Sequence, residues 1–159
     1  MENNTVFVRS ASDFTVVINV PHIPLHRVWQ KKGTKYPFDR KTLLEAYYDP
    51  SVESLFREGR LVTDDEKFLI EVGLKEEDSS ESVVVELTDA YKVRLIRTMP
   101  LSEVKKEVTK LTHAQIDELV NYAILHYTEL AMDRIDFFSK ISGMNVMGAI
   151  NNYKMSQEG

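Results

Sequence analysis

The chain has 159 residues, enough for one domain or two small ones, and its 28% charged and 43% hydrophobic residues are typical of a globular protein. This composition excludes a collagen-like, low-complexity or wholly disordered chain. Because there is no cysteine, disulfides, thiolate metal sites and a cysteine nucleophile are also excluded. No window reaches the roughly 18–20 apolar residues of a membrane helix, and the N-terminus lacks the pattern of a secretory signal, so we expect no membrane association.

The first half of the chain opens with two segments rich in β-branched residues, at 6–8 and 14–20. The residues between them, Ser10-Ala11-Ser12-Asp13, have the composition of a turn. The simplest prediction is therefore a hairpin of these two segments. A third short strand is predicted at 26–30.

Two short helices are predicted next, each preceded by an aspartate as N-cap. Asp39 precedes the first, and Asp49 precedes the second, which has Pro50 at its first position. A short strand is expected at 61–62. The segment 64–74 fits either a helix or the return arm of a hairpin, and the helix is favoured because aspartate and glycine flank it.

The charged residues are distributed unevenly along the chain. Residues 63–91 carry 2 basic and 10 acidic side chains, whereas the segments before and after them are close to neutral. The run Glu76-Glu77-Asp78-Ser79-Ser80-Glu81 has no apolar residue to bury, so we predict a solvated loop there. The predicted organisation is a β-rich unit with short helices at 1–75, an acidic linker or loop at 76–82 and a mainly helical unit at 83–157.

Helical signals dominate the second half. A strand-like run at 83–87 precedes a predicted helix over 89–98. The strongest signal is the capping box Thr112-His113-Ala114-Gln115, after which apolar residues recur at the spacing of one buried helix face. Further helices are predicted at 101–111, at 133–142 and from Asn145 onward. The fold class is therefore predicted to be α+β: a small N-terminal β-sheet unit followed by a bundle of about four helices.

Few residues offer a site for catalysis or metal binding. His22 and His26 have a spacing that would place both imidazoles on one face of a helix, but Pro24 between them disfavours a helix. The sequence has none of the common glycine-rich, nucleophile or zinc motifs. Carboxylate pairs such as Asp64-Asp65 are better explained as charged loops or helix starts. We therefore expect no enzyme, no metal and no cofactor.

The segment 27–41 interleaves basic and aromatic side chains, the combination that neutralises phosphates and stacks on the bases of single-stranded nucleic acid. Its basic and aromatic residues are Arg27, Lys31, Lys32, Lys35, Arg40 and Lys41, with Trp29, Tyr36 and Phe38. The alternative is that the lysines solubilise a turn and that Trp29 and Phe38 belong to the core. The pI of about 5.4 also argues against a dedicated nucleic-acid-binding domain.

Several large side chains indicate a surface for a protein partner, since Tyr and Met are enriched at interfaces. The residues concerned are Tyr47, Tyr48, Met144, Met147, Tyr153 and Met155. Core packing is the alternative for each, because methionine also fills cores. The C-terminal residues Met144, Met147 and Tyr153 form one candidate interface. Trp29 with the adjacent Lys31-Lys32 turn forms the other.

Several stretches of the sequence carry a resemblance to a known group of proteins. They are Arg27-Val28-Trp29-Gln30-Lys31-Lys32-Gly33, Leu43-Leu44-Glu45-Ala46-Tyr47-Tyr48-Asp49-Pro50, Leu55-Phe56-Arg57-Glu58-Gly59-Arg60-Leu61, and the pattern from Leu111-Thr112-His113-Ala114-Gln115-Ile116 to Gly143-Met144-Asn145-Val146. In these stretches the chain resembles small proteins encoded by tailed bacteriophages and prophages, chiefly of Gram-positive hosts. The resemblance implies a virion-associated or packaging-accessory protein and carries over no catalytic or binding residues.

Two functions stand as hypotheses. The favoured one is a non-enzymatic structural or accessory protein of a bacteriophage virion, present in the host cytoplasm during assembly. It would dock other phage structural proteins, and its own copies, through many weak contacts on a symmetric assembly. The alternative is a nucleic-acid-binding accessory or regulatory protein that uses the segment 27–41.

Overall fold

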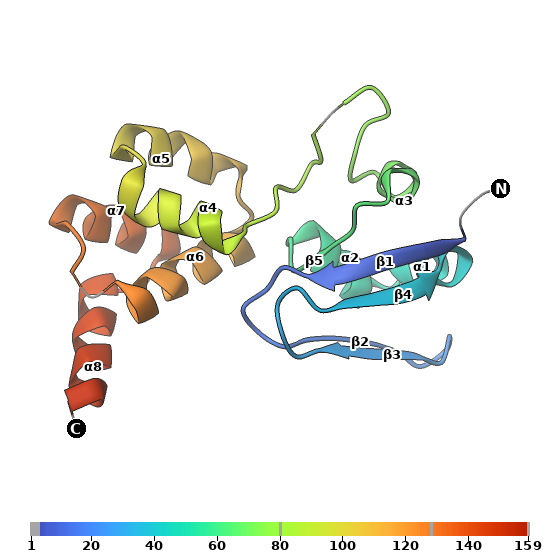
Figure 1. Cartoon of the computed structure of the whole chain (residues 1–159), viewed down its shortest axis with the longest axis horizontal. Helices are drawn as coiled ribbons and strands as arrows, with labels where there is room; N and C mark the ends of the chain where they lie inside the picture. Colours follow the sequence, from blue (N-terminus) through green and yellow to red (C-terminus); the bar gives the residue numbers. More distant parts are fainter. Residues whose placement is uncertain (1–3, 80, 128, 159) are drawn as a thin grey trace. The chain divides into compact units, whose positions relative to one another are not determined.

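The structure is a computed structural model that describes residues 4–79, 81–127 and 129–158, and the chain divides into two compact units after Glu86. Figure 1 shows strands and short helices in the first part of the chain (blue to green) and helices in the second (yellow to red). The fold is α+β, as the sequence predicts. We call residues 1–86 unit 1 and residues 87–159 unit 2, and describe each by itself.

Unit 1 contains two small antiparallel sheets. The larger consists of β4 (Lys35–Asp39), β1 (Thr5–Ser10) and β5 (Leu61–Val62), in that order, so that β1 lies in the middle. The smaller is a hairpin of β2 (Val16–Val20) and β3 (Leu25–Trp29). β1 therefore joins segments that are far apart in the sequence.

The predicted pairing of the first two strand segments is wrong, although both are strands. β1 pairs with β4, with Val6 opposite Phe38, while β2 pairs with β3. Distant residues hold the chain after β1, since the Ala11 N–H donates to the Arg60 carbonyl at 2.9 Å. β4 has no strand pattern in the sequence because Pro37 interrupts it, but an edge strand tolerates a residue that lacks an N–H.

Trp29, at the end of β3, connects the hairpin to the larger sheet. Its ring centroid lies 5.4 Å from that of Tyr36 and 5.9 Å from that of Phe38. Its Nε1–H donates to the Val8 carbonyl at 3.2 Å, and the side chain is 0% exposed. Because the indole N–H has a partner inside the apolar interior, Trp29 is a well-fixed core residue.

Three short helices complete unit 1: α1 (Arg40–Tyr47), α2 (Pro50–Arg57) and α3 (Glu66–Glu71). The carboxylates of Asp39 and Asp65 cap α1 and α3 by accepting hydrogen bonds from backbone N–H groups of their first turns. Asp49 caps α2 in the same way. The helix favoured for segment 64–74 is therefore confirmed, and so are the two helices predicted before it.

The three helices pack together through aromatic rings. Tyr47 of α1, Phe56 of α2 and Phe68 of α3 are buried, and their ring centroids are 5.6 to 5.9 Å apart. Such pairs stabilise a core by about 0.5–1.5 kcal/mol beyond the area they bury. The aromatic cluster fixes the ends of the helices relative to one another, and these ends form the site described below.

Contacts within unit 1 join the two ends of the acidic run. Lys75 and Ser82 form an isolated β-bridge at its base, and the Val83 N–H donates to the Leu74 carbonyl at 2.7 Å. The acidic residues therefore belong to unit 1, and the division between the two units follows Glu86.

The boundary between the units lies a few residues further on. Glu86 forms an ion pair with Arg9 of β1 at 2.6 Å, which holds the end of unit 1 against its sheet. The strand predicted at 83–87 is wrong, because no described strand pairs with this segment. β-branched residues favour a strand only where packing against a sheet supports it, so their composition alone does not make this segment one.

Unit 2 consists of helices with short connections. They are α4 (Asp89–Val93), the π-helix η1 (Arg94–Thr98), α5 (Leu101–Glu107), the 3₁₀-helix η2 (Val108–Lys110), α6 (His113–His126), α7 (Met132–Ser142) and α8 (Val146–Glu158). The predicted capping box is confirmed, since Thr112 and Gln115 exchange side-chain and backbone hydrogen bonds at 3.0 and 3.2 Å. Gly143, with a φ of 72°, ends α7 in the left-handed conformation.

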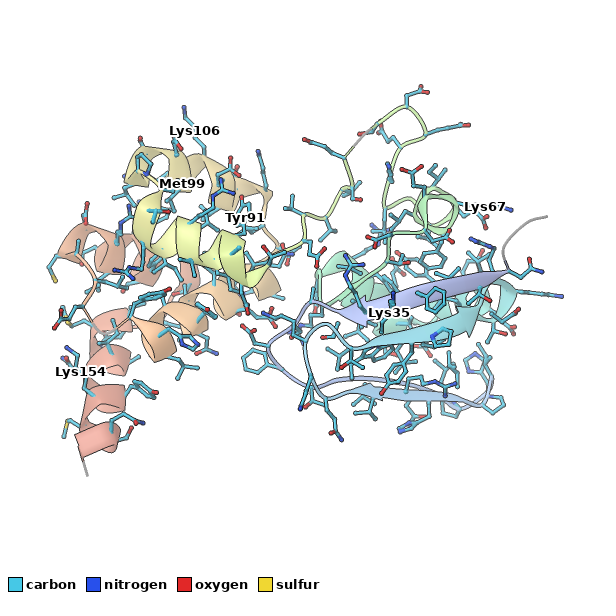
Figure 2. The ribbon with its side chains drawn as sticks, viewed as in Figure 1. Lys35, Lys67, Tyr91, Met99, Lys106 and Lys154 are labelled. Carbon is cyan, nitrogen blue, oxygen red and sulfur yellow. The ribbon has the colours of Figure 1, made fainter. Side chains whose placement is uncertain are left out.

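The core of unit 2 is mainly aliphatic, and Arg134 of α7 connects it to η1. Buried core residues include Leu95, Ile96, Leu119, Val120, Phe138 and Ile150. The Arg134 guanidinium donates to the Leu95 carbonyl at 3.0 Å and to the carbonyl of Met99, which Figure 2 labels. These carbonyls lie at the C-terminal end of η1, where a helix leaves carbonyl groups without an N–H partner of its own. The Arg134 guanidinium supplies the missing donors.

Candidate functional site

The structure separates the basic and aromatic residues of segment 27–41. Trp29 and Phe38 are buried in the core of unit 1, so neither can stack on a base. The prediction of a docking patch centred on Trp29 is wrong, because its indole connects the two sheets instead of facing solvent. Tyr36 is half-buried, and its hydroxyl donates to the Val28 carbonyl at 3.0 Å.

Two cations of this segment are paired with carboxylates of unit 1. Arg40 donates to both carboxylate oxygens of Asp65, at 2.8 and 2.7 Å, and Lys32 forms an ion pair with Asp13. The hydrogen bonds from Arg40 hold the pKa of Asp65 below its usual value. Arg40 and Lys32 therefore stabilise the fold of unit 1.

Arg27 and Lys31 line a shallow hollow beside β3. Its volume is about 510 Å³, and its lining residues are His26, Arg27, Val28, Gln30, Lys31, Thr34 and Tyr36. Among the described residues that line it there is no Asp or Glu. Arg27 donates to the His26 carbonyl at 2.8 Å and lies 5.8 Å from the centre of the Phe38 ring. We call this site the basic hollow; its charge suits one anionic group.

Lys35 and Lys41 lie outside the basic hollow. Lys35, labelled in Figure 2, extends from β4 over the ring of Phe7, with its Nζ 5.2 Å from the ring centre. Since successive side chains of a strand point to opposite faces, Lys35 and Tyr36 lie on different faces of β4. Lys41 is exposed on α1. The basic-aromatic segment is therefore divided among several places on unit 1.

The residues of the candidate interface in unit 2 pack partly into the core of that unit. Met144, Met147 and Tyr153 are half-buried and pack against the hydrophobic core of that unit. Met155, in contrast, is 68% exposed. Met147 and Tyr153 therefore help to hold α8 in place.

A groove lies where the ends of α1, α2 and α3 meet. Its volume is about 320 Å³, and its lining residues are Leu44, Tyr47, Tyr48, Glu53, Glu71 and Val72. Tyr48 directly follows α1 and is 85% exposed, more than any other large hydrophobic side chain in the described part of the chain. We call this site the tyrosine groove. It combines apolar, aromatic and acidic groups.

Tyr47 contributes a buried hydroxyl to the tyrosine groove. The residue is 7% exposed, and its Oη has no hydrogen-bond partner among the described residues. Burial raises the pKa of Tyr47, and the charges of Arg57 and Glu53 also act on it. Buried polar groups normally have a partner, so this hydroxyl, itself closed off from solvent, is left unsatisfied beside the groove.

The carboxylates of the tyrosine groove differ in their surroundings. Glu53 is paired with Arg57 on the next turn of α2, at 2.8 Å. Glu71, the last residue of α3, is exposed and has no ion pair within the part of the chain that the structure describes. The groove therefore keeps one negative charge available for a ligand.

A metal site and a membrane-spanning helix each have requirements against which the described residues can be compared. No three His, Asp or Glu side chains there are grouped as ligands for a metal ion. None of the described helices has the length and apolar composition to cross a membrane. The basic hollow and the tyrosine groove are two concave surfaces of unit 1 with different chemistry.

Sequence reasoning singled out Tyr47 and Tyr48, but it missed Glu53, Glu71 and Val72. These residues come from α2 and α3, and only the tertiary packing of the aromatic cluster brings them beside α1. The signal for Tyr48 in the sequence is its residue type, because tyrosine is enriched at interfaces. No family model matches the chain, and the comparisons with curated proteins and with solved structures found no match.

Proposed function

We propose that this chain is a non-enzymatic accessory protein of a tailed-bacteriophage virion that docks other virion proteins through the tyrosine groove. The phage setting follows from the resemblance in segments 27–33, 43–61 and 111–146. The observation that carries the docking surface is Tyr48, whose ring is 85% exposed at the rim of a groove. Tyrosine is enriched at interfaces because it offers a large contact area and loses little conformational entropy.

The groove is suited to docking because its walls are fixed in advance. The aromatic cluster of Tyr47, Phe56 and Phe68 holds the three helix ends together, so little ordering is required when a partner binds. A groove of this size gives a weak single contact. On a particle with many copies, repeated weak contacts add to a strong attachment, and the chain would reside in the host cytoplasm before it attaches.

Photo-cross-linking from the groove tests this function. Benzoylphenylalanine replaces Tyr48 in one variant and Phe14 in a control, during production of particles in the host. Phe14 is also exposed and belongs to unit 1, but it does not line the groove. We expect position 48 to cross-link to a virion protein that mass spectrometry identifies, and position 14 not to. Equal cross-linking from both positions, or none from position 48, contradicts the proposal.

A second candidate function is nucleic-acid binding at the basic hollow. It is favoured by Arg27 and Lys31, for which the described residues provide no ion pair, unlike Arg40 and Lys32. Fluorescence anisotropy of labelled single- and double-stranded DNA, at about 50 and 200 mM salt, measures it. Salt-sensitive binding that Arg27→Gln weakens and Lys41→Gln leaves unchanged supports this function. Absence of binding at the lower salt concentration rejects it.

A further inference from the structure

We infer that the tyrosine groove takes an arginine side chain of the docking partner. This inference rests on the proposed docking function and names the chemistry of the group that enters the groove. It joins three separate features of the groove: its charge, the exposed ring of Tyr48 and the buried hydroxyl of Tyr47.

The charge of the groove favours a cation. Its lining includes Glu53 and Glu71, and no Lys or Arg is among the described residues that line it. Arg57 offsets the charge of Glu53, while Glu71 is left without an ion pair in the described part of the chain. A cationic guest beside Glu71 therefore gains attraction that a neutral or anionic guest does not.

The two tyrosines favour a planar cation with several donors. The ring of Tyr48 is open to solvent, and a guanidinium can lie flat on such a ring. The Tyr47 hydroxyl is buried beside the groove without a partner, so a second N–H of the same guanidinium can satisfy it once the side chains around it move slightly apart. A lysine ammonium is more strongly hydrated and does not stack in this way, so arginine fits better.

The size of the groove agrees with a single side chain. Sites for small molecules usually enclose about 300–1,000 Å³, and the 320 Å³ of this groove is at the lower end. Leu44 and Val72 supply apolar contacts for the methylene groups of an arginine. The groove therefore receives one residue of a partner surface.

An NMR titration of the ¹⁵N-labelled full chain tests the inference. The probes are acetyl-Gly-Arg-Gly-amide and the same peptide with citrulline, which keeps the shape of arginine but has no charge. We expect the arginine peptide to shift the amide signals of Tyr48, Glu71 and Val72 in a saturable way. The citrulline peptide should bind at least roughly fivefold more weakly, because it lacks the ionic attraction.

Matched variants locate the binding. Glu71→Gln should weaken binding of the arginine peptide several-fold, whereas Glu77→Gln, the same change in the exposed acidic loop, should leave it unchanged. Equal binding of the two peptides, equal effects of the two variants or signal changes outside the groove overturn the inference. If position 48 cross-links to a virion protein but the arginine peptide does not bind, docking stands and the arginine assignment is wrong. If position 48 does not cross-link, the docking function itself fails.

Discussion

The two units of this chain are stabilised in different ways. Unit 1 joins distant segments around buried aromatic rings, with Trp29 between its two sheets and the Tyr47, Phe56 and Phe68 cluster between its helices. Unit 2 packs helices joined by short connections around a mainly aliphatic core, and Thr88 and Thr112 cap the starts of α4 and α6. The difference teaches that the tyrosine groove depends on a few long-range aromatic contacts, while unit 2 should be insensitive to their loss.

The largest expected effect comes from removing the indole of unit 1. Trp29→Ala leaves a cavity and removes the hydrogen bond to the Val8 carbonyl, so it should lower the free energy of unfolding of unit 1 by about 3–5 kcal/mol. Urea unfolding followed by two-dimensional NMR resolves the signals of both units. Tyr48→Ala, at an exposed position, is the matched control and should cost little. Loss of the α6–α8 signals at the same urea concentration would contradict the separation of the units.

The next largest loss of stability is expected when the hydrogen bonds of Arg134 in unit 2 are removed. Arg134→Met removes the two hydrogen bonds to the Leu95 and Met99 carbonyls, which should lower the free energy of unfolding by about 1.5–3 kcal/mol. Lys140→Met, at an exposed position of the same helix, is the control. Far-UV circular dichroism follows the helices of unit 2, and the fluorescence of Trp29, the sole tryptophan, follows unit 1. An unchanged helical transition in Arg134→Met would show that these bonds contribute little.

A smaller, pH-dependent effect is expected in unit 1. The pKa of Asp65 is lowered in the folded chain, first through its hydrogen bonds with Arg40. The ionised carboxylate therefore stabilises the fold above its ordinary pKa of about 3.9, and this contribution is lost as the pH falls through the lower folded value. Because the pair is partly exposed, we expect about 1 kcal/mol. Urea unfolding of Arg40→Met between pH 5 and 2.5 should show a weaker loss than the wild type; an equal loss would contradict the assignment.

The smallest effect is expected in unit 2 at high pH. Burial and a 2.5 Å hydrogen bond to Glu107 raise the pKa of Tyr91 to about 12. The neutral phenol therefore stabilises the fold fully below its ordinary pKa of about 10, and the contribution is lost as the pH rises towards 12. Tyr91→Phe should remove this dependence at a cost of under about 1 kcal/mol near pH 7. A spectroscopic titration that finds an ordinary pKa for Tyr91 would contradict the assignment.

The comparison of the units also explains which features the sequence predicts. The Thr112 capping box and the aspartate caps of unit 1 act on neighbouring residues, so the helices are visible in the sequence. Strand pairing is not local, because the partner of β1 lies about 30 residues away along the chain. In addition, Pro37 interrupts the strand pattern of β4 in the sequence. The segment 83–87 has strand composition but no neighbouring edge.

The candidate site is also predicted only where local sequence decides the outcome. The sequence identifies Tyr48 as a residue for an interface, but it does not show that Trp29 is buried or that Glu71 lies in the same groove. Burial of Trp29 depends on the contact between two sheets, and the position of Glu71 depends on the packing of α3 against α1 through aromatic rings. Composition alone therefore cannot separate a core aromatic residue from an exposed one.

The most direct test of the central claim, that unit 1 docks through the tyrosine groove, is the amount of chain incorporated into purified particles. Wild type, Tyr48→Ala and Phe14→Ala are produced at equal levels in the host and quantified in the particles by mass spectrometry. We predict that Tyr48→Ala is reduced roughly tenfold or more, as for the loss of an anchor residue, while Phe14→Ala matches the wild type. Incorporation of Tyr48→Ala at the wild-type level would contradict the claim.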